Sequence, residues 1–411
     1  MKTSLNSIID KIIWLLTVFL LTTFLVFGGY SWGRYAFLAV AFVIMLLTAV
    51  ADHGKLFIRI RTFHWFMLAF GGYTLMSSLW AISAADAVSK ALTIFQILVC
   101  AAMLYIHYEK KNDIQPLLTA VMWAGYFVVL YTIAFFGLDY LMDATEDFRM
   151  ESEYANSNSI GLAAALACTI QVNLFMYKKS RWSAILLIPS IVVIAASQSR
   201  KALLFLAIGI CGVYVVKHMQ NKGFLKKLLK LTLAVAILVF VFSQLYSLSI
   251  FDGIRQRMDS MLAYFTGEGK ADNSTVIRNQ MAQLGLEWFV KYPIFGVGIG
   301  SPHILSGKYL AFDTYLHNNY VEMLCGGGIV GFILYYGAYV YLFVKLFKYR
   351  NIDKECVGIG FVWMILMMIM DYGMVSYYTK EQWLYLMIHF LNIYHLGKKY
   401  KEQGNEYKQI A

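Results

Sequence analysis

Long apolar runs, separated by short polar segments, repeat along almost the whole chain. Each run is about as long as a helix needs to be to cross a bilayer, at ~20 residues. The pattern therefore predicts transmembrane helices near 12–29, 35–50, 63–80, 91–107, 117–138, 160–177, 182–197, 202–216, 228–250, 317–344, 356–375 and 383–397. The first run lacks a small-residue cleavage site and is predicted to be a span rather than a signal peptide. The runs 182–197 and 202–216 are short for spans, so this pair is alternatively a broken or re-entrant element.

Composition supports a membrane protein. The apolar fraction is 60%, the charged fraction is 14% and the mean hydropathy is +0.60, all far from the values of a soluble domain. We predict an all-α, polytopic membrane helical bundle of about 12 transmembrane helices. The expected divisions are nine helices in 1–251, an extracytoplasmic loop at 252–316, three helices in 317–397 and a cytoplasmic tail at 398–411. The five cysteines have no metal-ligand spacing and are expected to be small buried hydrophobic residues.

The distribution of positive charge predicts the orientation. With the N-terminus inside, 23 of the 35 Lys and Arg residues lie in inner segments and six in short outer loops. This is the positive-inside pattern, so both termini are expected in the cytoplasm and the long segment 252–316 outside. The net charge of +11 follows from this topology, and no nucleic acid is expected as a partner.

The long outer segment contains one predicted amphipathic helix. Apolar residues at helical spacing, Trp288 among them, run over 275–291, and the helix is expected to lie on or dip into the membrane surface. The following Gly296-Val297-Gly298-Ile299-Gly300 lacks the lysine and the serine or threonine of a phosphate loop. A turn that allows close backbone approach is expected there instead of a nucleotide site.

Two charged or titratable groups are unexpected at their positions. Arg200, followed by Lys201, lies in a very short outer turn, where it either snorkels to lipid phosphates or serves a reaction. His317 stands at the outer mouth of the tenth predicted span, where a histidine is often structural but can accept a proton from a hydroxyl. Asn318 and Glu322 share a helix face; His317 and Glu322 need not, so no His–Glu dyad is predicted. Acidic residues crowd 139–153, which is read as a solvated loop in preference to a divalent-cation site.

These features together resemble the O-antigen ligase and polysaccharide polymerase family. The motifs that carry the resemblance are Ser78-Leu79-Trp80, Ser197-Gln198-Ser199-Arg200, Arg278, Tyr292-Pro293-Ile294-Phe295-Gly296-Val297-Gly298, His317-Asn318-Asn319-Tyr320 and Gly328-Ile329-Val330-Gly331. One departure is Gly326, which stands where the family often has an acid. Any mechanism that relies on that acid is in doubt for this chain.

The resemblance implies a GT-C-like glycosyltransferase that needs no metal and no other cofactor. It would transfer glycan from undecaprenyl diphosphate to a sugar hydroxyl, on a growing glycan or lipid A core, at the outer face of the inner membrane. Arg200 and Arg278 match the two arginines thought to hold the donor diphosphate. His317 matches the catalytic histidine beside the scissile bond, which either activates the acceptor hydroxyl as a general base or only orients donor or acceptor. Supporting roles are expected for Lys201, Trp288, Asn318 and Glu322. A capsule or exopolysaccharide polymerase would work with a flippase and a chain-length regulator.

A transporter or flippase of the same lipid-linked glycans is the alternative. Transporters show inverted repeats and ionisable groups deep inside their spans. Here the chain shows no clear internal repeat, and its notable polar groups gather at the outer face. The sequence therefore favours the enzyme.

Overall fold

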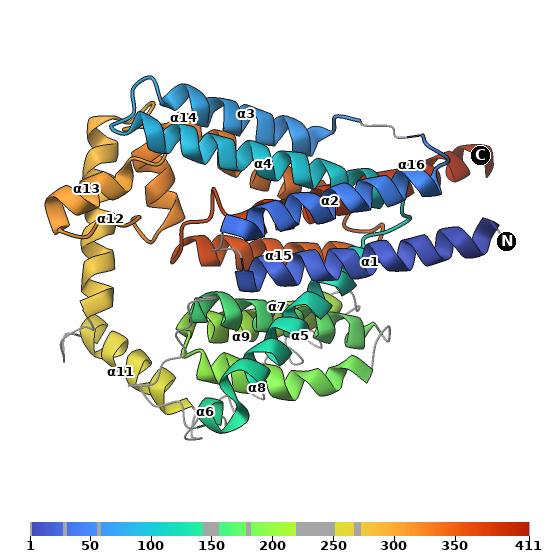
Figure 1. The fold of residues 1–411 in the computed structure, drawn as a ribbon, viewed down its shortest axis with the longest axis horizontal. Coiled ribbons are helices and arrows are strands. Elements are labelled where there is room, and N and C mark those ends of the chain that lie inside the picture. The colour runs from blue at the N-terminus through green and yellow to red at the C-terminus, as the bar shows by residue number, and fades with distance from the viewer. Residues whose placement is uncertain are drawn as a thin grey trace. The chain divides into compact units, whose positions relative to one another are not determined.

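The computed structural model shows that the chain is built from helices (Figure 1). The structure describes residues 2–27, 31–55, 59–142, 156–177, 182–218, 251–266 and 273–410. No strand occurs among these residues. The helices are α1 (Lys2–Phe27), α2 (Ser31–Ala51), α3 (Thr62–Ser77), α4 (Ala84–Tyr108), α5 (Gln115–Phe136), α6 (Leu138–Met142), α7 (Ser157–Met176), the 3-10 turn η1 (Trp182–Leu186), α8 (Leu187–Ala196), α9 (Arg200–His218), α11 (Asp252–Thr266), α12 (Asn273–Lys291), α13 (Pro302–Leu310), α14 (Asn319–Lys348), α15 (Lys354–Asp371) and α16 (Lys380–Ile410).

Six helices in the described ranges are long and apolar enough to cross a membrane. They comprise Leu5–Val26 of α1 together with α4, α5, α7, α9 and α14. The prediction of a polytopic helical membrane protein is therefore confirmed, whereas the count of twelve spans is not. The span expected at 228–250 lies outside the described residues, as does most of the acidic loop. The run 182–197 forms η1 and the ten-residue α8, which together are short for a span.

The chain divides into two compact units, each assembled from distant segments. The first comprises residues 1–40, 113–270 and 350–366. Its central helix is α7, which packs against α5, α8 and α9. A Cβ at Gly125 would lie 2.6 Å from the carbonyl oxygen of Ala163, so α5 and α7 approach each other with almost no side chain between them.

The second unit comprises residues 41–112, 271–349 and 367–411. Within it α3 packs against α4 and α14, and α16 packs against α3, α4 and α14. Aromatic rings fill the space between these helices: the ring of Phe70 lies 5.3 Å from Tyr335 and 5.8 Å from Trp383. Burial of such large rings supplies much of the packing energy of a helix bundle.

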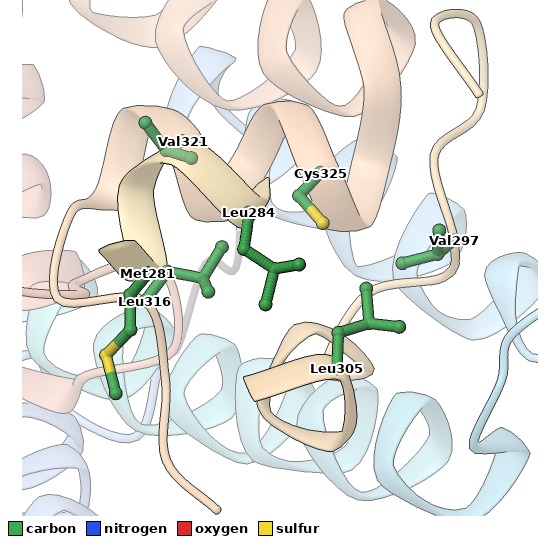
Figure 2. Packing of buried hydrophobic residues seen from close by; sticks show 7 residues of the cluster. All are labelled: Met281, Leu284, Val297, Leu305, Leu316, Val321 and Cys325. Atoms are coloured by element: carbon green, nitrogen blue, oxygen red, sulfur yellow. The ribbon is translucent and has the colours of Figure 1, made fainter. Parts of the chain in front are cut away.

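The helix predicted over 275–291 is present as α12, and it packs against α13 and α14. Its buried Met281 and Leu284 join a hydrophobic cluster with Val297, Leu305, Leu316, Val321 and Cys325 (Figure 2). One apolar face of α12 is thus used for packing within the protein. Exposed Leu286 and Val290 remain on its surface.

Candidate functional site

The glycine-rich loop after α12 is joined to a break in α14. At Gly328 the backbone leaves the helical conformation, with φ +59°, which frees carbonyl groups of the preceding turn. The N–H groups of Val297 and Gly298 donate to the carbonyl oxygens of Cys325 and Gly326, both at 2.9 Å. A Cβ at Gly296 would lie 2.5 Å from the Cys325 oxygen. The expected close backbone approach is therefore confirmed, and the glycines serve main-chain pairing.

Residues of α3 and of the motif that ends in Trp80 also bond to this loop and to the break in α14. The indole N–H of Trp80 donates to the carbonyl oxygen of Phe295 at 3.3 Å. The Tyr73 hydroxyl on α3 donates to the carbonyl oxygen of Gly327 at 2.6 Å. Segments more than 200 residues apart in sequence are therefore hydrogen-bonded to each other around the glycine-rich loop that leads into residues 302–318.

His317 lies in the turn that precedes α14. Its backbone is left-handed, with φ +56°, a conformation that costs a non-glycine residue about 1–2 kcal/mol. Asn318 caps α14 by accepting the N–H groups of Tyr320 and Val321 at 3.0 and 3.2 Å. Glu322, buried one turn later, accepts the N–H of Leu316 at 2.8 Å. The supporting residues Asn318 and Glu322 thus set the turn that carries His317.

Tyr315 lies beside His317 and interacts electrostatically with Arg278. The rings of Tyr315 and His317 have centroids 4.3 Å apart. Burial raises the pKa of Tyr315, and the positive charge of Arg278 opposes that rise. Arg278, a side chain of α12, is therefore close enough for its charge to act on a group beside the imidazole, although the two residues are 39 positions apart.

Lys90 brings another positive charge to this part of the second unit. Its ammonium group lies 3.5 Å from the ring centroid of Tyr378 and interacts electrostatically with Glu322. In the sequence, Lys90 is one of the six cations of the predicted short outer loops, just before the apolar run 91–107. No periodicity linked it to Tyr378, because the contact depends on how α4 packs beside the segment that precedes α16.

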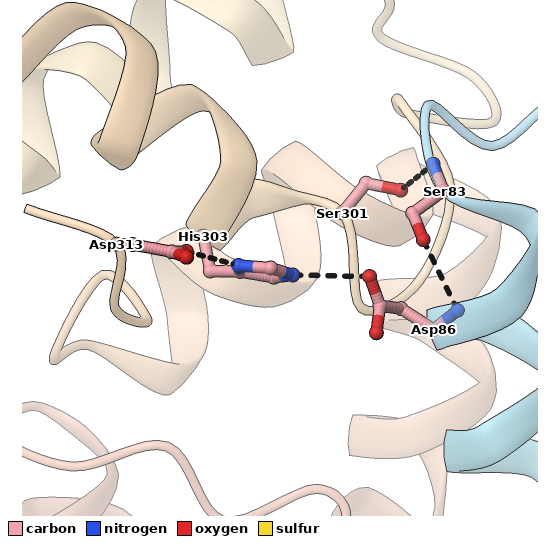
Figure 3. A network of polar contacts seen from close by, with 5 residues as sticks. All are labelled: Ser83, Asp86, Ser301, His303 and Asp313. Carbon is pink, nitrogen blue, oxygen red and sulfur yellow. Dashed lines mark hydrogen bonds and ion pairs between the residues drawn. The ribbon is translucent and has the colours of Figure 1, made fainter.

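A second histidine was missed altogether. His303 on α13 lies between two carboxylates, with Nδ1 2.6 Å from Asp313 and Nε2 3.1 Å from Asp86 (Figure 3). Partial burial lowers the pKa of His303, but the bonds to Asp313 and Asp86 outweigh this effect and raise the pKa above its usual value. The Ser83 hydroxyl caps α4 by accepting the N–H of Asp86 at 3.2 Å, and the Ser83 N–H donates to Ser301.

The remaining predicted site residues divide between the units. Trp288 lies on α12 with its ring 5.9 Å from that of Tyr292 and Lys291 over its face, so it belongs to the second unit. Arg200 and Lys201 open α9 in the first unit, at partial exposure. The meeting of Arg200 with Arg278 and His317 stays a prediction.

The fold and the site define a class of protein: a polytopic helical membrane protein with cationic and titratable side chains around the turn that precedes α14. Residues 183–336 match the family model described as O-antigen ligase, and this segment contains Arg200, Arg278 and His317. The resemblance seen in the motifs is confirmed over this segment, which covers less than half of the chain. The family implies a membrane enzyme of the ligase or polymerase type, with a lipid-linked glycan donor and an acceptor. The comparison with curated proteins gives no match.

Proposed function

We propose that this protein is a glycosyltransferase that moves glycan from undecaprenyl diphosphate to a sugar hydroxyl at the outer face of the cytoplasmic membrane. The observation that supports the proposal is that Tyr315, just before α14, lies beside the ring of His317 and interacts electrostatically with Arg278. A guanidinium and an imidazole at one helix end suit a reaction that breaks a bond to a diphosphate and takes a proton from a hydroxyl.

In the proposed reaction the bond between the sugar C1 and the diphosphate oxygen breaks while the acceptor oxygen bonds to C1. The electron pair of the broken bond stays on the diphosphate, and Arg278, together with Arg200, stabilises the added negative charge. Planar guanidinium groups suit this role because each can donate two parallel hydrogen bonds to phosphate oxygens. His317 accepts the acceptor proton, and undecaprenyl diphosphate is the second product.

The turn around His317 supports a positioning role for its neighbours. Asn318 and Glu322 each use a side-chain oxygen to fix a backbone N–H next to His317 or within the first turn of α14. Trp288 and Lys201 stay proposed supporting residues, on α12 and α9 respectively. The GT-C-like architecture and the metal-free reaction also stay predictions.

The proposed orientation places both termini in the cytoplasm and this site outside. Within the family, a polymerase for capsule, exopolysaccharide or O-antigen would act with a flippase and a chain-length regulator. A ligase would instead transfer a finished chain to lipid A core.

The proposal is tested with the purified protein in proteoliposomes, supplied with undecaprenyl-diphosphate-linked oligosaccharide and an acceptor glycan. We expect new glycosidic product in excess EDTA, with release of undecaprenyl diphosphate. Loss of product in EDTA, regained on adding a divalent cation, would contradict the metal-free reaction. Deletion of the gene then separates the two family activities: single-repeat surface glycan indicates a polymerase, and unattached long chains indicate a ligase.

A further inference from the structure

A separate cavity of about 470 Å³ lies in the second unit. This volume is within the range of small-molecule sites in proteins. Its wall is rich in basic and aromatic side chains and is formed by Arg59, Arg61, Thr62, Phe63, Tyr105, Tyr341, Lys345, Tyr349, Phe390, Ile393, Tyr394, Gly397, Lys398 and Lys401. We call it the basic pocket.

The basic pocket lies at the opposite end of the bundle from His317. Helix α3 begins at the pocket with Thr62 and ends at Ser77, whose hydroxyl accepts the N–H of Ile299 in the glycine-rich loop. Helix α14 begins beside His317 and reaches the pocket at Lys345. Helix α14 is broken at Gly328, and its 20 residues from there to Lys348, at 1.5 Å per residue, span ~30 Å, about the thickness of the hydrocarbon layer. The two sites therefore belong to opposite membrane faces.

Positive charge dominates the basic pocket. Five of its wall residues are Lys or Arg, and the described wall contains no acid. Arg61 pairs with Glu109 just outside the wall. The N-terminus of α3, which carries the positive end of the helix dipole, adds to the attraction for an anion. Like charges crowded in a concavity repel one another, so an anion that binds there relieves that repulsion.

The surroundings of the pocket indicate a lipid as the source of that anion. Buried Phe63 and Phe390 form apolar parts of the wall. Nearby on α3 and α14, Trp65, Val344 and Phe347 are each about 60% exposed, at 62%, 61% and 62%. Exposed large apolar side chains next to Lys and Arg are typical of the boundary between hydrocarbon and headgroups. A free phosphate ion would gain no binding energy from these apolar side chains.

We propose that the basic pocket binds the phosphate-bearing headgroup of an anionic membrane lipid from the leaflet at that face. The phosphate contacts Lys345, Lys398 and Lys401, and the start of the acyl region lies against the exposed apolar side chains of α3 and α14. Pockets of this kind between membrane helices bind anionic headgroups in general. The proposal concerns a site remote from His317 and does not depend on the proposed transfer reaction.

The test uses the full-length protein in a neutral detergent and measures binding of dihexanoyl phosphatidylglycerol by thermal stabilisation. Dihexanoyl phosphatidylcholine and inorganic phosphate at equal concentrations serve as reference ligands. We expect saturable stabilisation by phosphatidylglycerol, and little by either reference. The double variant Lys398→Gln with Lys401→Gln should weaken that binding about 30-fold, from roughly a fivefold loss for each lysine near a lipid phosphate.

Lys398 and Lys401 are exposed, so their replacement leaves the bundle core intact. The matched control is Lys55→Gln with Lys354→Gln, two exposed lysines outside the pocket wall, and it should bind as wild type does. Equal affinity in the pocket and control variants would overturn the proposal. Stabilisation by inorganic phosphate equal to that by phosphatidylglycerol would overturn the assignment to a lipid.

Discussion

Replacing His317 with glycine, alanine and asparagine separates its backbone role from its chemical role. The residue has a left-handed backbone at φ +56°, which glycine adopts without strain and which asparagine tolerates better than most residues. If His317 serves only the backbone turn, glycine or asparagine should replace it with little loss of activity. A histidine that takes a proton would be replaced by neither.

The expected free energies of unfolding follow from the turn. Alanine and glycine both lose the ring contact with Tyr315, whose centroid lies 4.3 Å away, at about 0.5–1.5 kcal/mol. Glycine removes the ~1–2 kcal/mol of left-handed strain from the folded protein. It also destabilises the folded protein by ~0.5–1 kcal/mol, because its unfolded chain is more flexible. His317→Gly should therefore be about 0.5–1 kcal/mol more stable than His317→Ala.

Activity should follow a different order. We expect all three variants to lose transfer by about 10²–10⁴-fold, the usual contribution of a general base. Thermal unfolding in detergent ranks the stabilities, and product formation from the lipid-linked donor in proteoliposomes ranks the activities. Transfer at wild-type rate by the glycine or asparagine variant would refute the chemical role and leave His317 a turn residue.

Three further changes test the surrounding structure. Glu322→Leu leaves the N–H of Leu316 without its acceptor and should lower the free energy of unfolding by about 1–3 kcal/mol. Glu322→Gln keeps an acceptor oxygen and should lower that free energy less. Thermal unfolding of the two variants makes the comparison. Gly298 has φ +98°, and a Cβ added there would lie 2.2 Å from the Cβ of Ala81. Gly298→Ala should therefore abolish the yield of folded protein in size-exclusion chromatography. Gly72→Ala is the control, because a Cβ added at Gly72 meets nothing within 4 Å, and it should give the normal yield. The pKa of His303 is raised in the folded protein, so its ion pairs stabilise the fold fully below pH ~6.5, and this stabilisation is lost as pH rises through the raised pKa. The unfolding temperature of wild type should therefore exceed that of His303→Gln by more at pH 6 than at pH 9. The difference should be modest because the carboxylate partners of His303 are exposed.

The helical membrane class and the helix at 275–291 could be predicted because both depend on local hydrophobic pattern. The close approach at Gly296 and Gly298 was also predictable, since glycine spacing reports backbone geometry directly. The break in α14 that receives this loop was not, because Gly328 reads as one more small residue in an apolar run.

The candidate site was only partly visible in the sequence. Arg278 and His317 were found through family motifs, whereas Lys90 and His303 carry no local signal. Their partners, Tyr378 and Asp86, come from segments 288 and 217 residues away in the chain. Such pairs become evident only when helices that are distant in sequence are packed together.

The central claim, that arginine holds the diphosphate while His317 takes the proton, is tested by measuring donor binding and transfer separately. Purified wild type, Arg278→Lys and His317→Asn are each given radiolabelled undecaprenyl-diphosphate oligosaccharide in EDTA, with Arg255→Lys as the matched arginine control. We expect Arg278→Lys to lose both donor retention and transfer, His317→Asn to retain donor without forming product, and the control to match wild type. Retention and transfer at wild-type levels in both site variants would contradict the account.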